Sequence, residues 1–147
     1  MNARNKIYAV IDTNVLVSTL YSKNGTSNPG IVINQVLEGN IIPLVNSAIL
    51  TEYKEVLSRP KFNFPPNLIS DLFDAFAELG IDTETNPTDP NLFPDKDDIV
   101  FYEVKMAVDD SYLVTGNIKH FPKNPLIVTP AQMVEILKEK GLLRNTL

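Results

Sequence analysis

The sequence predicts an α/β protein, a three-layer α/β/α sandwich around a central, mostly parallel sheet. Short apolar runs without internal alternation indicate strands that are buried on both faces, as in parallel sheets. These runs alternate with segments of helical periodicity, and neither a repeat nor a linker interrupts the pattern. The length of 147 residues is typical of one domain, so we expect a single domain over residues 1–147.

The first part of the chain predicts a strand, a helix and a second strand. Residues 7–11 are an uninterrupted apolar run that ends at Asp12. A loop is expected at residues 24–30, which are rich in Asn, Gly, Ser and Pro. Helical spacing then continues to Gly39, and residues 41–45 form the second apolar run.

Two helices are predicted in the middle of the chain. Ser47 suits the N-cap of a helix that runs to Ser58, because Pro60 stops it there. Pro66 opens the next helix, and Gly80 ends it.

The last third predicts a loop, two strands and two helices. Residues 86–95 contain three prolines and are expected to form a loop. A helix is predicted from about 97 to 108, followed by strands at 112–115 and 126–128. A final helix is expected after Pro130.

The composition excludes several classes of function. The chain has no cysteine, which removes disulfides, thiolate zinc sites and cysteine nucleophiles. Its one histidine, His120, cannot form a two-histidine zinc motif. No apolar run approaches the roughly 20 residues that span a bilayer, and the polar start has no signal-peptide pattern. We therefore expect a cytoplasmic protein without membrane attachment, whose chemistry rests on carboxylates.

The charge is unevenly distributed along the chain. The net charge of -5 argues against a protein that simply coats nucleic acid. Residues 62–104 contain ten acids and one base, a charge of -9, so the remainder carries +4. A polyanionic partner would be repelled by the acidic segment and tolerated by the rest of the chain.

Two acidic side chains are expected near the carboxyl edge of the sheet, where open α/β sheets bind ligands. Asp12 directly follows the first strand, where burial of its charge requires compensation by a cation or, alternatively, a role as a helix cap. Glu52 lies three residues after Ile49 on the apolar stripe of its helix. It therefore needs a cation, a basic partner or a shifted pKa.

Further oxygen-bearing side chains are expected at the same edge. Asp97 and Asp98 begin a helix, and N-capping is the alternative role for both. Helical spacing from Phe101 does not choose between them. Asn117 follows a strand, with a turn beside Gly116 as its alternative role. Three or four such side chains at one edge favour Mg²⁺ or Mn²⁺, which prefer oxygen ligands.

Four blocks of sequence resemble PIN-domain nucleases, the family named for the PilT N-terminus. The blocks are residues 11–17 (IDTNVLV), 49–53 (ILTEY), 95–103 (DKDDIVFYE) and 110–117 (DSYLVTGN). The resemblance covers residues 7–130 and is greatest to the VapC-like toxin ribonucleases of prokaryotic toxin–antitoxin systems. It implies a PIN-like fold and a nuclease activity.

The resemblance also implies roles for individual residues. The implied ligands of one or two Mg²⁺ or Mn²⁺ ions are Asp12, Glu52 and Asp98. Asp98 is preferred to Asp97 because the family's third acid precedes an aromatic or aliphatic residue by three, and Phe101 stands there. Asn117 takes the place of a fourth acid, and an amide is a weaker ligand for a second metal ion. Supporting roles, by hydrogen bonds, are implied for Asn14 and Thr115. We also expect Asp97 to support the site beside Asp98.

The implied reaction is metal-assisted hydrolysis of phosphodiester bonds in single-stranded RNA. We hypothesise that RNA follows the positively charged part of the chain, contacting Lys23, Arg59, Lys61, Lys119, His120 and Lys123. The implied partners are an antitoxin protein and a second copy of the chain, for which the helix around Phe73 and Phe76 offers apolar surface. The alternative is a PIN fold without turnover that binds RNA or protein, which Asn117 favours.

Overall fold

Five strands in the described part of the chain form one parallel sheet. A computed structural model describes residues 6–22 and 26–143. The strands are β1 (Ile7–Ile11), β2 (Ile41–Val45), β3 (Ile81–Asp82), β4 (Tyr112–Val114) and β5 (Ile127–Val128). Their order is β3-β2-β1-β4-β5, and every neighbouring pair is parallel. The expected α/β class with a parallel sheet is therefore confirmed.

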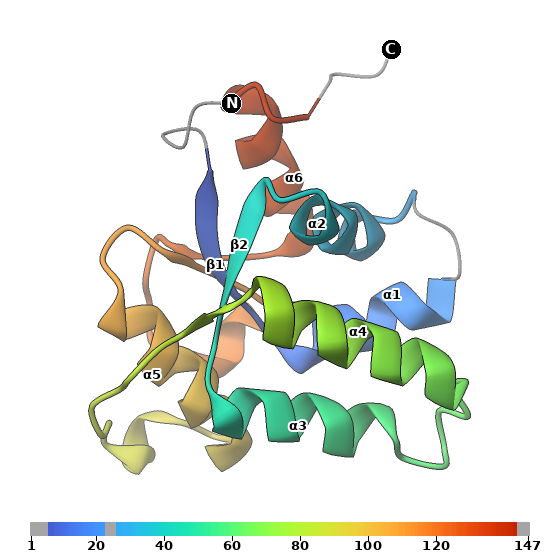
Figure 1. Cartoon of the computed structure of the whole chain (residues 1–147). Helices are drawn as coiled ribbons and strands as arrows, with labels where there is room; N and C mark the ends of the chain where they lie inside the picture. The colour runs from blue at the N-terminus through green and yellow to red at the C-terminus, as the bar shows by residue number, and fades with distance from the viewer. Residues whose placement is uncertain (1–5, 23–25, 144–147) are drawn as a thin grey trace.

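Helices cover both faces of this sheet. They are α1 (Thr13–Ser22), α2 (Asn28–Leu37), α3 (Ser47–Leu57), α4 (Pro66–Leu79), α5 (Ile99–Ala107) and α6 (Pro130–Glu139). Short 3-10 turns lie at η2 (Pro90–Leu92), η3 (Lys96–Asp98) and η4 (Ile118–His120). Figure 1 shows α1, α2 and α4 on one side of the strands and α5 on the other. None of the helices in the described ranges is both long enough and apolar enough to cross a bilayer.

The strand order creates a crevice between β1 and β4. The chain moves outward from β1 to β2 and β3, then returns to add β4 on the other side of β1. Crossovers leave β1 and β4 in opposite directions, and open α/β sheets bind ligands at such a point. Because Ile11 pairs with Val114, the next residues, Asp12 and Thr115, emerge side by side at the carboxyl edge.

The core fixes α3 beneath the end of β1. Tyr53 of α3 is fully buried and donates its hydroxyl to the carbonyl oxygen of Ile11. Its ring packs edge-on against Phe76 at 5.5 Å and lies 6.2 Å from the ring of Phe101. These contacts join α3, α4 and α5 below the sheet, and they place Glu52, the neighbour of Tyr53, near the same edge.

The structure corrects several predictions of local detail. Asn46, rather than Ser47, is the N-cap of α3, because its Oδ1 accepts a hydrogen bond from the amide of Ile49 at 2.9 Å. The helix expected from 97 begins at Ile99, after the 3-10 turn η3. The two-residue edge strand β3 had no periodicity by which it could be predicted.

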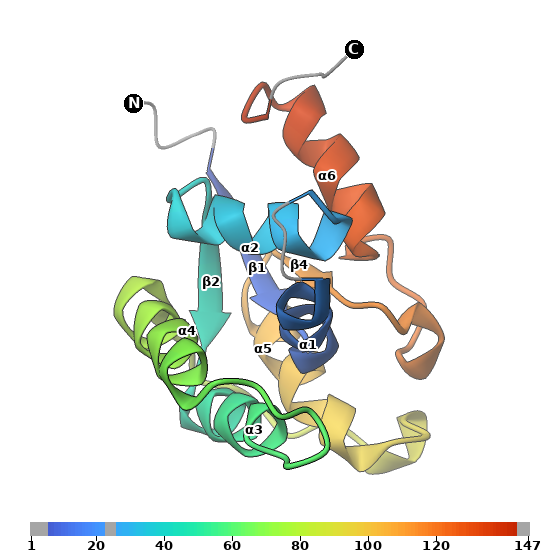
Figure 2. The same cartoon turned by 90° about the vertical axis from the view of Figure 1, so that its right-hand side faces the viewer.

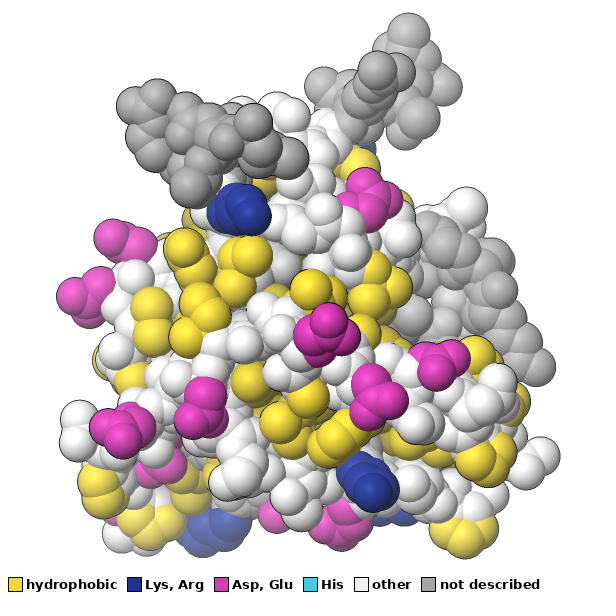
Figure 3. All heavy atoms as spheres, in the orientation of Figure 1, with side chains coloured by type: hydrophobic (Ala, Val, Ile, Leu, Met, Phe, Trp, Pro, Cys, Tyr) yellow, Lys and Arg dark blue, Asp and Glu magenta, His cyan; other side chains and the backbone are white. Residues whose placement is uncertain are grey.

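Helix α4 presents an acidic outer face. Its exposed acids are Asp71, Asp74 and Glu78, and Figure 3 shows acidic side chains spread over this helix. Phe76 points the other way and is fully buried, which corrects the expectation that it supplies surface for a second copy. The acidic segment therefore faces solvent over α4, as the RNA-path hypothesis requires.

Candidate functional site

Asp12 lies at the end of β1 with its carboxylate held by two side chains. It is 5% exposed. Its Oδ2 accepts hydrogen bonds from Thr115 Oγ1 at 2.8 Å and from Asn14 Nδ2 at 3.1 Å. Burial nevertheless raises the pKa of Asp12, against the lowering effect of the hydrogen bond from Thr115. The fold therefore orients this carboxylate but does not offset the free-energy cost of burying its charge.

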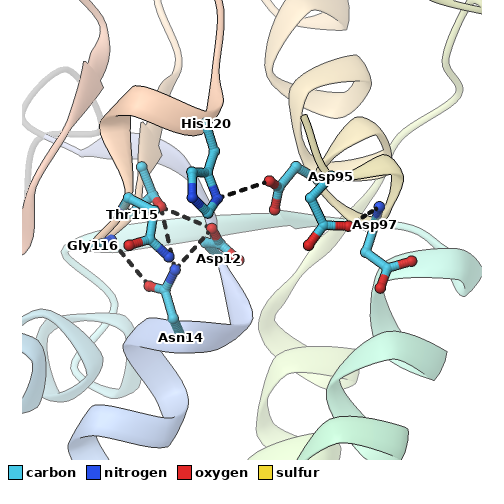
Figure 4. A network of polar contacts seen from close by, with 9 residues as sticks. Asp12, Asn14, Asp95, Asp97, Thr115, Gly116 and His120 are labelled. Carbon is cyan, nitrogen blue, oxygen red and sulfur yellow. Dashed lines mark hydrogen bonds and ion pairs between the residues drawn. The ribbon is translucent and has the colours of Figure 1, made fainter. Parts of the chain in front are cut away.

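Asn14 and Thr115 connect the start of α1 to the segment after β4 (Figure 4). Asn14 Oδ1 accepts from the amide of Gly116 at 3.0 Å, and Asn14 Nδ2 lies 3.4 Å from Thr115 Oγ1. Thr115 is fully buried and also accepts from the amide of Asn117 at 3.0 Å. This network closes around one oxygen of Asp12, so it holds the carboxylate in a single orientation.

Asp98 approaches the same site from the turn before α5. Its Oδ2 lies 3.2 Å from Nδ1 of His120, which comes from the 3-10 turn after β4. The pKa of Asp98 is raised to about 6, first by burial and then by the charges of Asp12 and Asp95, while His120 lowers it. The effect of Asp12 on Asp98 indicates that the two carboxylates face a common space.

Asp95 performs the capping role that was the alternative for Asp97 and Asp98. It is the N-cap of η3, and its Oδ1 accepts from the amide of Asp97 at 2.9 Å. Asp98 occupies the N-cap position of α5 without a side-chain capping bond. The carboxylates of Asp97 and Asp98 are therefore not used to cap either helix.

Glu52 is half-buried in α3 and shares the site. Its pKa is raised by burial, then by the charges of Asp97 and Glu55, and lowered by Arg59. Arg59 itself forms an ion pair with Glu55 at 3.8 Å. Within residues 6–22 and 26–143, no Lys or Arg forms an ion pair with Glu52. The basic partner that the sequence left open is thus absent from the described part of the chain.

These acids line one cavity of about 260 Å³. Its acidic lining residues are Asp12, Glu52, Asp95, Asp97 and Asp98. Two buried side-chain oxygens of the described residues, Thr13 Oγ1 and Asp98 Oδ2, have no hydrogen-bond partner. For Asp98 Oδ2, the contact with His120 at 3.2 Å is an ion pair without hydrogen-bond geometry. Both residues line this cavity. Clustered carboxylates with raised pKa values and unpartnered oxygens fit a hard divalent cation.

The arrangement of the acids limits how such a cation could be held. In the described ranges, no three Asp, Glu or His side chains lie close enough together to hold one metal ion. Mg²⁺ usually keeps several waters and is bound through one or two carboxylates. The donor set therefore fits a cation with one or two direct carboxylate ligands, with the remaining acids acting through water.

The other residues predicted from the sequence lie around this cavity. Asn117 is exposed and does not line it, and its backbone amide bonds Thr115. Arg59 lines the cavity, and Lys61 is exposed nearby in the chain. Lys119 and Lys123 are exposed after β4, and Lys23 lies outside the described residues.

Sequence reasoning missed three residues of the site. Asp95 was assigned to a loop, His120 was considered only as a contact of the RNA, and Thr13 was assigned no role in the site. The sequence did contain a signal for His120, since it lies three residues after Asn117, beyond the same strand. The 3-10 turn that carries it back toward Asp98 has no periodicity that could be recognised.

Comparison with known proteins identifies relatives for most of the chain. The profile described as PIN domain matches residues 8–119. The chain is similar to the uncharacterized protein MJ1680 of Methanocaldococcus jannaschii, with 30% identity over 115 residues, 76% of this chain and 72% of that protein. No solved structure matches the chain significantly. The matched region contains Asp12, Glu52, Asp98 and Thr115.

Proposed function

The chain belongs to the PIN domain family, and from that premise we propose that it is a divalent-metal-dependent ribonuclease that hydrolyses phosphodiester bonds of single-stranded RNA. The observation that carries the proposal is the cavity at the carboxyl edge of β1 and β4. It brings Asp12, Glu52 and Asp98 together from three distant segments, and burial raises the pKa of each carboxyl. In the described part of the chain no Lys or Arg forms an ion pair with these three acids, so their partly buried charge costs stability unless a cation offsets it.

Each residue has a defined part in this proposal. Asp12, Glu52 and Asp98 would hold Mg²⁺ or Mn²⁺, one or two of them directly and the others through water, and the ion would supply activation of water and compensation of charge on the scissile phosphate. Thr115 and Asn14 fix the orientation of Asp12 through the hydrogen bonds at 2.8 and 3.1 Å. Asp95 positions Asp97 and Asp98 by capping η3. Asn117 is proposed to contact the substrate from the exposed turn after β4.

RNA is proposed to reach the cavity over the positively charged part of the surface. Arg59 already lines the cavity, so its guanidinium can pair with a phosphate of the bound strand. Lys61, Lys119 and Lys123 extend the path on either side. The exposed acids of α4 would repel a strand that approaches from their side.

We also propose a biological setting for this activity. The four blocks shared with VapC-like ribonucleases support a cytoplasmic toxin component of a toxin–antitoxin system, partnered by an antitoxin protein and acting as a homodimer. This setting rests on sequence resemblance, whereas the proposed chemistry rests on the cavity.

One observation favours a second function. The acids do not approach closely enough for three of them to hold one ion in the described part of the chain, and His120 contacts the oxygen of Asp98. A PIN fold that has lost turnover and binds RNA or protein would have the same arrangement. Cleavage activity therefore decides between the two functions.

The test is cleavage of a mixed-sequence single-stranded RNA with Mn²⁺, with Mg²⁺ or with EDTA. Asp12→Asn should abolish cleavage, because it removes a ligand charge while leaving the side-chain size unchanged. Asp71→Asn is the matched control, since Asp71 is an exposed acid on α4. Metal-dependent cleavage lost only in Asp12→Asn supports the nuclease. RNA binding without cleavage in every condition supports the binding module instead.

A further inference from the structure

A second, larger cavity lies beside the carboxylates. Its volume is about 750 Å³, and it is lined mainly by apolar and aromatic side chains from α1 and from the loop between α3 and α4. Figure 2 shows that loop directly below the end-on view of α1. Pockets of about 300–1,000 Å³ with apolar walls are typical of sites for small organic groups.

Three aromatic rings form one side of this cavity. Phe62 and Phe64 are stacked, with centroids 5.3 Å apart and an interplanar angle of 7°. Tyr21 meets both rings edge-on, at 5.8 and 5.4 Å. Tyr21 is nevertheless 58% exposed, so a large part of its surface is open to a ligand. The cluster is thus ordered by its own contacts but not covered.

The backbone between the two Phe rings is specially shaped. Asn63 has a φ of 51°, a left-handed conformation that few residues other than Gly and Asn adopt readily. Backbone bonds from Phe62 to Arg59 and from Asn63 to Pro60, both at 3.1 Å, close the turn before it. The stacked rings are therefore part of a defined turn.

The aromatic cavity adjoins the carboxylate cavity. Phe62 lines both. Along α1, Val17 lines the carboxylate cavity and Tyr21 lines the aromatic one. Residues four apart in a helix are separated by about 6 Å along its axis. A strand whose phosphate lies at the carboxylates can therefore place a neighbouring base against the rings.

Positive charge borders the aromatic cluster. Lys61 Nζ lies 5.2 Å from the centroid of the Phe62 ring, and Arg59 lines the adjoining cavity. Cations beside exposed aromatic rings are the combination that binds single strands, since the cations follow the phosphates while the rings stack on the bases. An apolar segment of another protein would be matched by the rings but not by these cations.

We propose that Tyr21, Phe62 and Phe64 form a stacking subsite for one unpaired base of the RNA strand bound at the carboxylates. The inference rests on the proposed function and deepens it, because it assigns recognition of a base to a surface outside the acidic site. Tyr21 presents the accessible ring, and Phe62 and Phe64 hold it in place.

Binding of fluorescein-labelled uridine hexanucleotide in EDTA tests the subsite without cleavage. Tyr21→Leu keeps an apolar side chain but removes the ring, and it should weaken binding about 10-fold. Tyr21→Phe should bind as the unaltered protein does. The matched control is Tyr8→Leu, because Tyr8 is 40% exposed and is the second residue of β1, near the opposite end of that strand from Asp12.

A second set of probes identifies the base. Six hexanucleotides each carry one abasic position. One of them should bind the unaltered protein about 10-fold more weakly than the intact probe does, and Tyr21→Leu should not weaken its binding further. Equal affinity of Tyr21→Leu and the unaltered protein for the intact probe overturns the subsite alone. Failure of the unaltered protein to bind any probe, both in EDTA and with Mn²⁺ added, overturns the subsite and the proposed RNA substrate together. If Tyr21→Leu weakens the binding of all six abasic probes to the same extent, then Tyr21 does not stack on one base, and the subsite is also overturned.

Discussion

The burial and raised pKa of Asp98 indicate that this carboxyl has a role in the site. Its side chain is 13% exposed, and its pKa is raised from 3.8 to about 6 by burial and by the charges of Asp12 and Asp95. A carboxyl whose pKa is higher in the folded than in the unfolded protein contributes stability below the unfolded pKa, and that contribution is lost as pH rises through the folded pKa. In the metal-free protein, the contribution of Asp98 to stability is therefore lost as pH rises from about 4 to about 6, and the loss persists at higher pH. A bound cation would reverse this.

Asp98→Asn should therefore stabilise the metal-free protein at pH 7. One pKa unit corresponds to about 1.4 kcal/mol, and solvent screening at this partly open site reduces the expected gain in unfolding free energy to about 1 kcal/mol. The gain should vanish near pH 4, where the carboxyl is protonated in the folded protein. Urea unfolding in EDTA from pH 4 to pH 8 measures it, with Asp71→Asn as the exposed-acid control.

Metal addition provides the complementary measurement. Mn²⁺ should raise the unfolding free energy of the unaltered protein at pH 7 and have a smaller effect on Asp98→Asn, because binding to the folded state stabilises it. Equal unfolding free energies for the two proteins across the whole pH range would contradict the assigned role of Asp98.

Among the secondary-structure elements, α3 has the greatest influence on the site. It carries Glu52, and Tyr53 anchors it to the last residue of β1 through a buried hydrogen bond. Its start is set by Asn46, whose side chain accepts from the amide of Ile49, although the residue type of Ser47 made it the more obvious cap in the sequence. Both residue types cap helices well, so only the backbone conformation distinguishes them, with Asn46 in the extended region.

Asn46→Ala should lower the unfolding free energy by about 1 kcal/mol, because it removes the capping bond of α3. Ser47→Ala should change it by a few tenths of a kcal/mol or less, because Ser47 is exposed and lies within the helix. Urea unfolding of the two variants side by side gives the comparison. A larger loss in Ser47→Ala would restore the cap predicted from the sequence.

The molecule as a whole separates its charges. Acids cover the outer face of α4, whereas Lys119 and Lys123 lie on the segment after β4, beyond the Thr115 that supports Asp12. A protein with a net charge of -5 can bind RNA only if the strand avoids the acidic face. This separation supports a path that enters over the positively charged segments.

Lys119→Glu combined with Lys123→Glu should weaken RNA binding at low salt and reduce the dependence of affinity on salt. Each phosphate contact of a single strand contributes about 0.7 to the slope of log K against log salt. Lys138→Glu with Lys140→Glu makes the same change of charge on α6, and Lys140 lies near the start of β1, at the opposite end of that strand from Asp12. Affinity titrations at several salt concentrations compare the two pairs. Identical slopes in both would remove Lys119 and Lys123 from the RNA path.

The fold class, four of the five described strands and the approximate positions of α2 to α6 could be predicted from the sequence, whereas no extent was predicted for α1. These features follow from interactions between near neighbours in the chain, namely apolar periodicity, proline and glycine boundaries and turn chemistry. Asp12 and Glu52 could be selected for the same reason, since a strand end and a helical stripe place their charges against the core. Asp98 was preferred to Asp97 only through the resemblance to PIN-domain nucleases.

The way in which these residues meet depends on packing between distant segments of the chain. The contact of Asp98 with His120, the replacement of Asp98 by Asp95 as a cap, and the joining of Tyr21 to Phe62 and Phe64 all depend on packing between distant segments. Such contacts leave no periodic signal, because their geometry is set by the crossing of α1, the α3–α4 loop and the turn after β4. Local sequence positions a carboxylate at the edge of the sheet, and the packed fold determines which charges and rings surround it.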